Sequence, residues 1–211
     1  MLTRTVPRLD RTRSARAGWP LTQRRLTAWL CAPGSLTARL RAHGQVTVRV
    51  LCQGHLPLWP QEQAAIGCRS GHVREVMLMV GGRPAVWARS ATPLIATQGA
   101  WRAIKGLGTR PLAELLFTHR QVQRGPLQAR RLAATSREGA RVRRSWCQHT
   151  PTSLPGPCPP PEWARHSVFH HKGQPLQVLE AFSPWVGMLL TPRPARSRPT
   201  GSPQRPARRR G

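Results

Sequence analysis

The sequence predicts an α+β protein built on an antiparallel β-sheet. Two observations carry this prediction. Segments with an apolar period of two come in adjacent pairs joined by glycine-containing turns, which is typical of β-hairpins. Segments with a helical period are short and gather near the start and in the middle of the chain. Strands and helices do not alternate regularly, as they would around a parallel sheet, and the chain has no internal repeat.

Two short helices and a strand are predicted for the first part of the chain. Residues 1–18 are basic and without a period, so we expect a flexible lead-in there. The segment Leu21–Leu30 is amphipathic, and a second helix is expected from the Ser35 cap to Gly44. From Val46 the period changes to two, which predicts a strand.

Two β-hairpins are the clearest elements of the chain. Gly81-Gly82 joins the strands of the first, and Lys172-Gly173 joins those of the second. Paired or single glycines suit these turns because glycine tolerates the positive φ that a tight hairpin requires. The four predicted strands are His72–Val80, Arg83–Ser90, Ala164–His171 and Pro175–Phe182.

Between and beside the hairpins, the sequence predicts several short elements and two irregular segments. They are a loop at 54–70, two short helices at 98–107 and 111–117, a strand at 122–132 and an irregular stretch at 150–162. Pro111 opens the second of these helices, since the first helical position needs no N–H donor. The irregular stretch contains LPGPCPPP, which neither a helix nor a central strand could accommodate.

The composition is strongly basic, with a formal charge of +27, yet the arginines are unevenly placed. Seven lie in each of the ranges 1–25, 124–144 and 188–211, and 11 lie in the rest of the chain. Only two basic residues are lysines and tyrosine is absent, which indicates a coding bias. The charge therefore describes peripheral segments, and nucleic-acid binding is not expected as the main function.

The cysteines and the hydropathy point to a cytoplasmic protein without a membrane span. The five cysteines form no CxxC pair, so we expect reduced thiols and neither a disulfide framework nor a metal site. No apolar run approaches the roughly 18–20 residues of a spanning helix. The N-terminus lacks the apolar segment and cleavage pattern of a secretory signal.

Glu180 is the sharpest anomaly among the predicted strands. Alternate residues of a strand point to one face, so Glu180 shares a face with Leu176, Val178 and Phe182. Burying a carboxylate among apolar neighbours is costly without a partner. A functional carboxylate is one interpretation, and a solvated acid at the edge of the sheet is the other.

Arg74 repeats this pattern on the first hairpin, because it shares its strand face with apolar residues. A guanidinium on an inward face can bind a carboxylate through two parallel hydrogen bonds. The alternative is an ion pair with Glu75 or Glu180. Together, Arg74 and Glu180 indicate a mostly apolar pocket for a small carboxylated ring that carries a hydroxyl. The turn in GLGTRPL at 106–112 adds backbone N–H groups that could meet an anionic oxygen.

Three blocks of the chain resemble chorismate pyruvate-lyase over about residues 20–185. They are KGLGTRPLAELLFT, the hairpin REVMLMVGGRPAVWARS and the segment EWARHSVFHHKGQPLQVLEAFSP. The resemblance implies a sheet of about six strands whose short helices cover an internal ligand pocket. It also implies an enzyme, a carbon–oxygen lyase that splits chorismate into 4-hydroxybenzoate and pyruvate at the entrance to ubiquinone biosynthesis. No metal or other cofactor is implied, and we expect a monomer.

The resemblance also implies the residues of the site. The product-binding arginine corresponds to Arg74, the leucine after the TRPL turn to Leu112 and the glutamate of the last strand to Glu180. Leu36 stands where the family has a methionine, a volume-conserving exchange. Arg74 and Glu180 are the implied catalytic residues. Glu180 is either a base or a group that positions the substrate.

The expected domain organisation follows the resemblance. A chorismate lyase-like domain spans 19–187, with an Arg/Pro-rich insertion at about 137–161 that lies outside the pocket. Residues 188–211 are expected to be a disordered tail. Two other functions stay open: a small-ligand-sensing module of related fold, and a basic RNA-associated protein. The first would need a DNA-binding domain and the second aromatic residues among its basic clusters.

Overall fold

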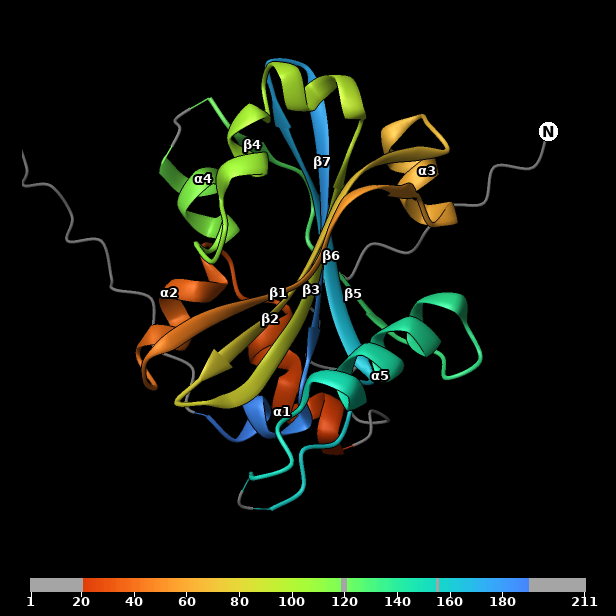
Figure 1. Ribbon diagram of the computed structural model, residues 1–211. Helices are drawn as coiled ribbons and strands as arrows, with labels where there is room; N and C mark the ends of the chain where they lie inside the picture. The colour runs from red at the N-terminus through yellow and green to blue at the C-terminus, as the bar shows by residue number, and fades with distance from the viewer. Residues whose placement is uncertain (1–20, 119–120, 155, 190–211) are drawn as a thin grey trace, which may run out of the picture.

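A seven-stranded antiparallel sheet forms the centre of the molecule (Figure 1). The computed structural model describes residues 21–118, 121–154 and 156–189. The strands are β1 (Val46–Pro57), β2 (Ser70–Val80), β3 (Arg83–Thr92), β4 (Gln123–Arg124), β5 (Gln128–Arg131), β6 (Trp163–His171) and β7 (Gln174–Phe182). Their order is β1-β2-β3-β7-β6-β4, and β5 also pairs with β6. The α+β prediction is confirmed, with one strand more than the resemblance implied.

Both predicted hairpins are present. Gly81 and Gly82 turn β2 into β3 with φ values of 55° and 79°, and Lys172 and Gly173 turn β6 into β7 with 48° and 73°. The second strand of each hairpin pairs antiparallel with that of the other, so that Ala88 of β3 lies opposite Glu180 of β7. This central pairing brings the two hairpins into one continuous sheet.

The helices are short, as expected. The α-helices are α1 (Leu21–Leu30), α2 (Leu36–Arg41), α3 (Pro60–Ile66), α4 (Leu112–Thr118) and α5 (Arg137–His149). The 3-10 helices are η2 (Leu94–Gln98), η3 (Arg102–Gly106) and η4 (Pro184–Met188). Ser35 caps α2 as predicted, because its hydroxyl accepts a hydrogen bond of 3.2 Å from the Ala38 amide. Within the described part of the chain, no helix is long and apolar enough to cross a membrane.

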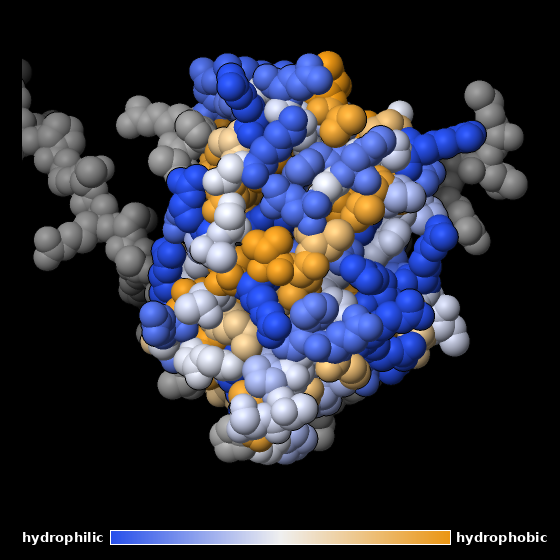
Figure 2. Space-filling model, viewed as in Figure 1, coloured by the Kyte–Doolittle hydropathy of each residue, from blue (hydrophilic) through white to orange (hydrophobic). Residues whose placement is uncertain are grey.

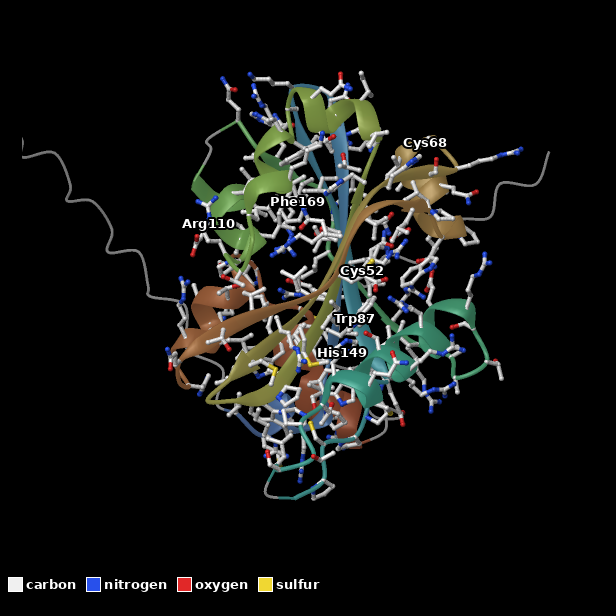
Figure 3. The ribbon with its side chains drawn as sticks, viewed as in Figure 1. Cys52, Cys68, Trp87, Arg110, His149 and Phe169 are labelled. Atoms are coloured by element: carbon white, nitrogen blue, oxygen red, sulfur yellow. The ribbon has the colours of Figure 1, made fainter. Side chains whose placement is uncertain are left out.

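The sheet is covered on both faces. Figure 1 shows α2 and α4 on one side of it and α3 and α5 on the other. Figure 3 shows Phe169 beside α4 and Trp87 beside α5, on opposite sides of the sheet. Trp87 is fully buried and its indole N–H donates to Ser145 Oγ of α5 at 3.1 Å. One apolar layer therefore lies under α5, and the layer on the opposite face surrounds the pocket.

Three assignments from the sequence are corrected. The predicted loop at 54–70 contains the end of β1 and the helix α3, and the predicted helix at 98–107 is replaced by η2 and η3. The predicted strand at 122–132 is split into β4 and β5 because Gly125 and Pro126 interrupt it. The segment predicted as an insertion, 137–161, begins with the regular helix α5, to which the sequence analysis gave no secondary structure. The expected flexible ends, 1–18 and 188–211, lie outside the described residues, except for Met188, which ends η4, and Leu189.

The face under α3 and α5 is held by buried ion pairs. Arg89 of β3 donates to Glu62 of α3 at 2.7 Å and to Glu75 of β2 at 2.8 Å. Arg141 of α5 binds the second oxygen of Glu75 at 2.5 Å. Burial alone would lower the pKa of Arg89, but its hydrogen bonds and charges with the two glutamates raise it. These bonds attach both helices to the sheet, away from the pocket.

Candidate functional site

The pocket lies between the sheet and the helices α2 and α4. Its walls are mostly apolar and include Leu36, Val48, Val76, Leu78, Leu112 and Phe169. Six charged or hydroxyl-bearing residues of the strands interrupt this lining: Arg74, Arg89, Ser90, Arg124, Arg165 and Glu180. An apolar pocket with a few convergent polar groups is the usual form of a small-molecule site.

The pocket exists because the central strand β3 carries small residues where its neighbours carry large ones. Ala88 lies opposite Val76 on one side and opposite Glu180 on the other. Ser90 lies opposite Arg74 and Val178 in the same way. Ala88 remains partly accessible in the middle of the sheet, since it faces the cavity. The small side chains of β3 thus form the floor of the site.

The structure brings all four residues that the sequence singled out into this one pocket. Leu36 lines it from α2, Arg74 from β2, Leu112 from α4 and Glu180 from β7. These positions are far apart in the sequence and meet only through the pairing of the two hairpins and the covering helices. Figure 3 places Phe169, which also lines the pocket, on this side of the sheet.

Arg74 is almost fully buried, with 2% of its surface exposed. One terminal nitrogen, Nη2, donates to the carbonyl oxygens of Gly108 at 2.8 Å and Arg110 at 3.1 Å. Its Nε is buried and has no partner among the described residues. Burial lowers the pKa of Arg74. An incoming carboxylate would stabilise a guanidinium in this state, because a buried donor without a partner is costly.

The alternative interpretation of Arg74, an ion pair with Glu75 or Glu180, does not fit the structure. Glu75 points to the opposite face, where Arg89 and Arg141 bind it. Glu180 pairs instead with Arg165 of β6, whose Nε donates to Oε2 at 2.6 Å. The turn at 106–112 meets Arg74 through carbonyl oxygens, so in this structure it orients the guanidinium.

Glu180 is held in place by a buried cation. The Arg165 side chain is 1% exposed and that of Glu180 is 17% exposed. The Nη1 of Arg165 donates to the carbonyl oxygens of Trp29 at 2.8 Å and Ala32 at 2.9 Å, at the end of α1. The same guanidinium thus fixes the carboxylate and the chain between α1 and α2. The solvated-edge interpretation of Glu180 does not fit this burial.

Two arginines of the pocket were missed by the sequence analysis. Arg165 lies directly opposite Glu180 in the β6–β7 hairpin, so counting back from the Lys172-Gly173 turn would have paired them. Arg124 lines the pocket as well, although its segment, 124–144, had been considered peripheral. Its composition hid it, because seven arginines in that range suggested a solvated surface.

The part of the chain that the structure describes contains no cluster of potential metal ligands. Within residues 21–118, 121–154 and 156–189, no three His, Cys, Asp or Glu side chains lie together. The five cysteines are all free thiols in the structure. The site is thus composed of guanidinium groups, one carboxylate, hydroxyls and apolar walls.

Comparison with known proteins identifies a family. The family model described as "Chorismate lyase" matches residues 21–186. Two relatives bear the name "Probable chorismate pyruvate-lyase". The one from Albidiferax ferrireducens is 43% identical over 67% of this chain and 73% of its own length. The one from Aromatoleum aromaticum is 39% identical over 82% of this chain and 91% of its own length.

Solved structures give weaker matches. A GntR-family transcriptional regulator from Bacillus cereus has a TM-score of 0.43 at 7% identity, covering 66% of this chain and 92% of that one. The effector domain of PhnF from Mycobacterium smegmatis has a TM-score of 0.42 at 12% identity, covering 71% and 88%. The family model, in contrast, spans residues 21–186 and so includes every element that builds the pocket. The chain therefore belongs to the chorismate lyase family.

Proposed function

We propose that this chain is a chorismate pyruvate-lyase that converts chorismate into 4-hydroxybenzoate and pyruvate. The observation that carries the proposal is one mostly apolar pocket that is lined by both a buried guanidinium and a partly buried carboxylate. Its relatives bear the name of this activity. As the resemblance implies, the reaction would take place in the cytoplasm, in a monomer, and would supply ubiquinone biosynthesis.

Arg74 binds the ring carboxylate and Glu180 accepts a hydrogen bond from the ring hydroxyl in this proposal. The register places Arg74 and Glu180 on strands separated by β3, two residues out of line with each other. Their Cα atoms are therefore about 12 Å apart, given the usual spacing of strands and residues. In this proposal, the benzenoid acid lies between the two side chains, both of which line the pocket.

The apolar walls hold the ring and exclude water. Leu36 and Leu112 come from helices that cover the sheet, so they close the pocket over the ring. Phe169 and Phe117 meet edge to face, with ring centroids 6.3 Å apart, at the α4 side of the pocket. In a dry site the charged contacts of Arg74 and Glu180 are stronger than in water.

The chemistry needs few protein groups, because chorismate carries both the hydrogen and its acceptor. The hydrogen on the ring carbon that bears the hydroxyl moves to the enolpyruvyl methylene, and the ether bond breaks. The methylene becomes the methyl group of pyruvate, the ether oxygen becomes its carbonyl oxygen, and the ring becomes aromatic. The protein holds the reactive conformer and stabilises charge in the transition state. Glu180 positions the hydroxyl during this step.

Incubation of the purified chain with chorismate tests the proposal. We expect the ultraviolet absorbance of 4-hydroxybenzoate to appear, together with an equal amount of pyruvate measured by a coupled dehydrogenase. The equal release of the two products separates this reaction from a rearrangement of chorismate, and a sample without protein measures the uncatalysed elimination. Complete absence of 4-hydroxybenzoate from a folded protein would contradict the proposal.

A further inference from the structure

The pocket carries more positive than negative charge. Arg74, Arg124, Arg165 and Glu180 line it with charged groups, and Arg165 and Glu180 neutralise each other at 2.6 Å. Arg89 also borders the pocket, but its guanidinium is bound to two carboxylates on the opposite face of the sheet. Two positive charges, those of Arg74 and Arg124, therefore remain without a carboxylate partner among the described residues.

No acid within the described residues is available to neutralise them. The chain has seven acidic residues, and one of them, Asp10, lies outside the described part. Each of the other six, all glutamates, is already in an ion pair with an arginine other than Arg74 and Arg124. The two excess charges of the pocket are thus left for a ligand.

This excess fits the substrate better than the product, if the proposed function holds. Chorismate carries two carboxylates, one on the ring and one on the enolpyruvyl group, whereas 4-hydroxybenzoate keeps only the ring carboxylate. One of the two unpaired arginines is therefore needed by the substrate alone. A guanidinium matches a carboxylate in geometry as well as in charge.

Arg124 is held in a fixed position without an anion. Its Nε donates to Ser167 Oγ at 3.0 Å, and its Cζ lies 5.2 Å from the centre of the Phe169 ring. Its Nη1 makes a longer contact of 3.4 Å with the carbonyl oxygen of Gly34. Burial lowers the pKa of Arg124, and the charge of Arg165 lowers it further. The charge of Glu180 acts in the opposite direction but does not outweigh them. An anion at this place would stabilise the guanidinium.

The order of the strands matches the order of groups on chorismate. Arg74 lies on β2, Glu180 on β7 and Arg124 on β4, so the glutamate lies between the two arginines across the sheet. In chorismate the ring carboxylate is at one end of the ring, and the hydroxyl and the neighbouring enolpyruvyl ether are at the other. With the ring carboxylate on Arg74 and the hydroxyl at Glu180, the enolpyruvyl group extends toward β4.

We propose that Arg124 binds the enolpyruvyl carboxylate of chorismate and that Ser167 positions its guanidinium for this contact. Arg124 then distinguishes substrate from product, because the aromatic product has no group that reaches it. After cleavage the carboxylate on Arg124 belongs to pyruvate, while 4-hydroxybenzoate keeps its contacts with Arg74 and Glu180. This assignment rests on the proposed function.

The substitution Arg124→Gln tests the assignment when both ligands are measured. We expect the KM for chorismate to rise by at least about tenfold, with a smaller change in kcat, because a ground-state charge contact is lost. The dissociation constant of 4-hydroxybenzoate, measured by calorimetry, should change by less than about twofold, since the product makes no such contact. Arg102→Gln, an exposed change of the same charge, is the control and should alter neither value.

Several outcomes would overturn the inference. An unchanged KM for chorismate excludes the contact, and an equal loss of 4-hydroxybenzoate affinity means that Arg124 supports the whole pocket. If Arg124→Gln melts far below the wild type, Ser167→Ala decides in its place and should shift only the chorismate value. A wild-type chain that forms no product would instead contradict the proposed function. Calorimetric binding of chorismate to wild type and Arg124→Gln would then decide the role of Arg124 separately.

Discussion

At the scale of single residues, the site depends on how each charged side chain is supported. Arg74 is oriented by main-chain carbonyl oxygens, and Glu180 by the buried guanidinium of Arg165. Carbonyl oxygens leave the net charge of Arg74 uncompensated, whereas Arg165 neutralises Glu180. One end of the pocket thus attracts an anion, while the other accepts a hydrogen bond from a neutral hydroxyl.

Replacing Arg74 should abolish most of the binding of the aromatic acid. For Arg74→Ala we expect a loss of about 2–5 kcal/mol in the binding free energy of 4-hydroxybenzoate, as for a buried charge contact that loses one partner. Calorimetric titration measures it. The control Arg110→Ala removes an exposed arginine of the same turn, bonded to the carbonyl oxygen of Gly106 at 3.1 Å. Equal affinities of wild type and Arg74→Ala would remove this residue from the site.

Replacing the carboxylate should separate folding from activity. Glu180→Gln keeps the shape and one hydrogen-bond acceptor for Arg165, so we expect a folded protein. Conversion of chorismate should fall on the order of 10²-fold, because the ring hydroxyl loses its charged acceptor. Product absorbance gives the rate. Glu162→Gln, at an exposed ion pair with a 61% accessible side chain, should react like the wild type. Wild-type turnover by Glu180→Gln would show that the residue is dispensable.

At the scale of elements, the central strand β3 decides whether there is a pocket at all. Its two faces carry opposite kinds of side chain. Trp87 and Arg89 point toward α5 and α3, and Ala88 and Ser90 point toward the cavity. The large residues bind the covering helices, and the small ones leave space for a ligand.

Filling this space should block binding without unfolding the protein. Ala88→Leu adds a branched side chain to the floor of the cavity, so we expect at least about a tenfold loss of 4-hydroxybenzoate affinity at a nearly unchanged melting temperature. Ala181→Leu is the matched change on β7, in the packed layer of the opposite face, where Ala181 is fully buried. It should lower stability by about 1–3 kcal/mol instead. A destabilised Ala88→Leu protein with normal affinity would contradict this account.

The sequence predicted the strands of the two hairpins, which have clear turn signals. It missed helices whose capping signals lie among polar residues. The hairpins have their glycine turns, but α3 lies in a segment taken as a loop. Its start is marked by Pro60 and by Glu62, whose carboxylate accepts from the Trp59 amide at 2.8 Å, and its end by Gly67 with φ of 80°.

The helix α5 was missed because its arginines suggested an insertion. Ser136 caps it by accepting from the Gly139 amide at 3.0 Å, and Val142 and Trp146 are buried one turn apart. A capping serine followed by apolar residues at i and i+4 is a helix signal that composition obscured. Arg124 and Arg165 depend on strand pairing, which the resemblance did not cover residue by residue.

At the scale of the whole molecule, the excess of arginine is accommodated by main-chain oxygens. With only seven acids against 34 basic residues, most arginines have no carboxylate to bind. Arg39, Arg74, Arg83 and Arg165 each donate to at least one backbone carbonyl. Figure 2 shows that the surface is largely hydrophilic on this side, with an apolar patch over the edge strand β1, which carries the partly exposed Val50. The positive field of such a surface attracts small anions to the molecule.

Buried histidines among these cations should make the protein less stable in acid. Burial lowers the pKa of His72 from 6.5, and the charges of Lys105 and Arg74 lower it further. Below about pH 6.5 the unfolded chain binds a proton at this position that the folded protein does not, so the free energy of unfolding falls as the pH falls. Melting temperatures between about pH 5 and about pH 8 measure this slope.

The variant His72→Asn tests whether this one side chain contributes to that slope. Asparagine does not titrate, so we expect a flatter dependence of melting temperature on pH than in the wild type. His166, whose pKa burial and the charge of Arg130 also lower, should account for part of what remains. A slope equally steep in His72→Asn would mean that His72 is protonated as readily in the folded protein as in the unfolded chain, contrary to its burial beside two cations.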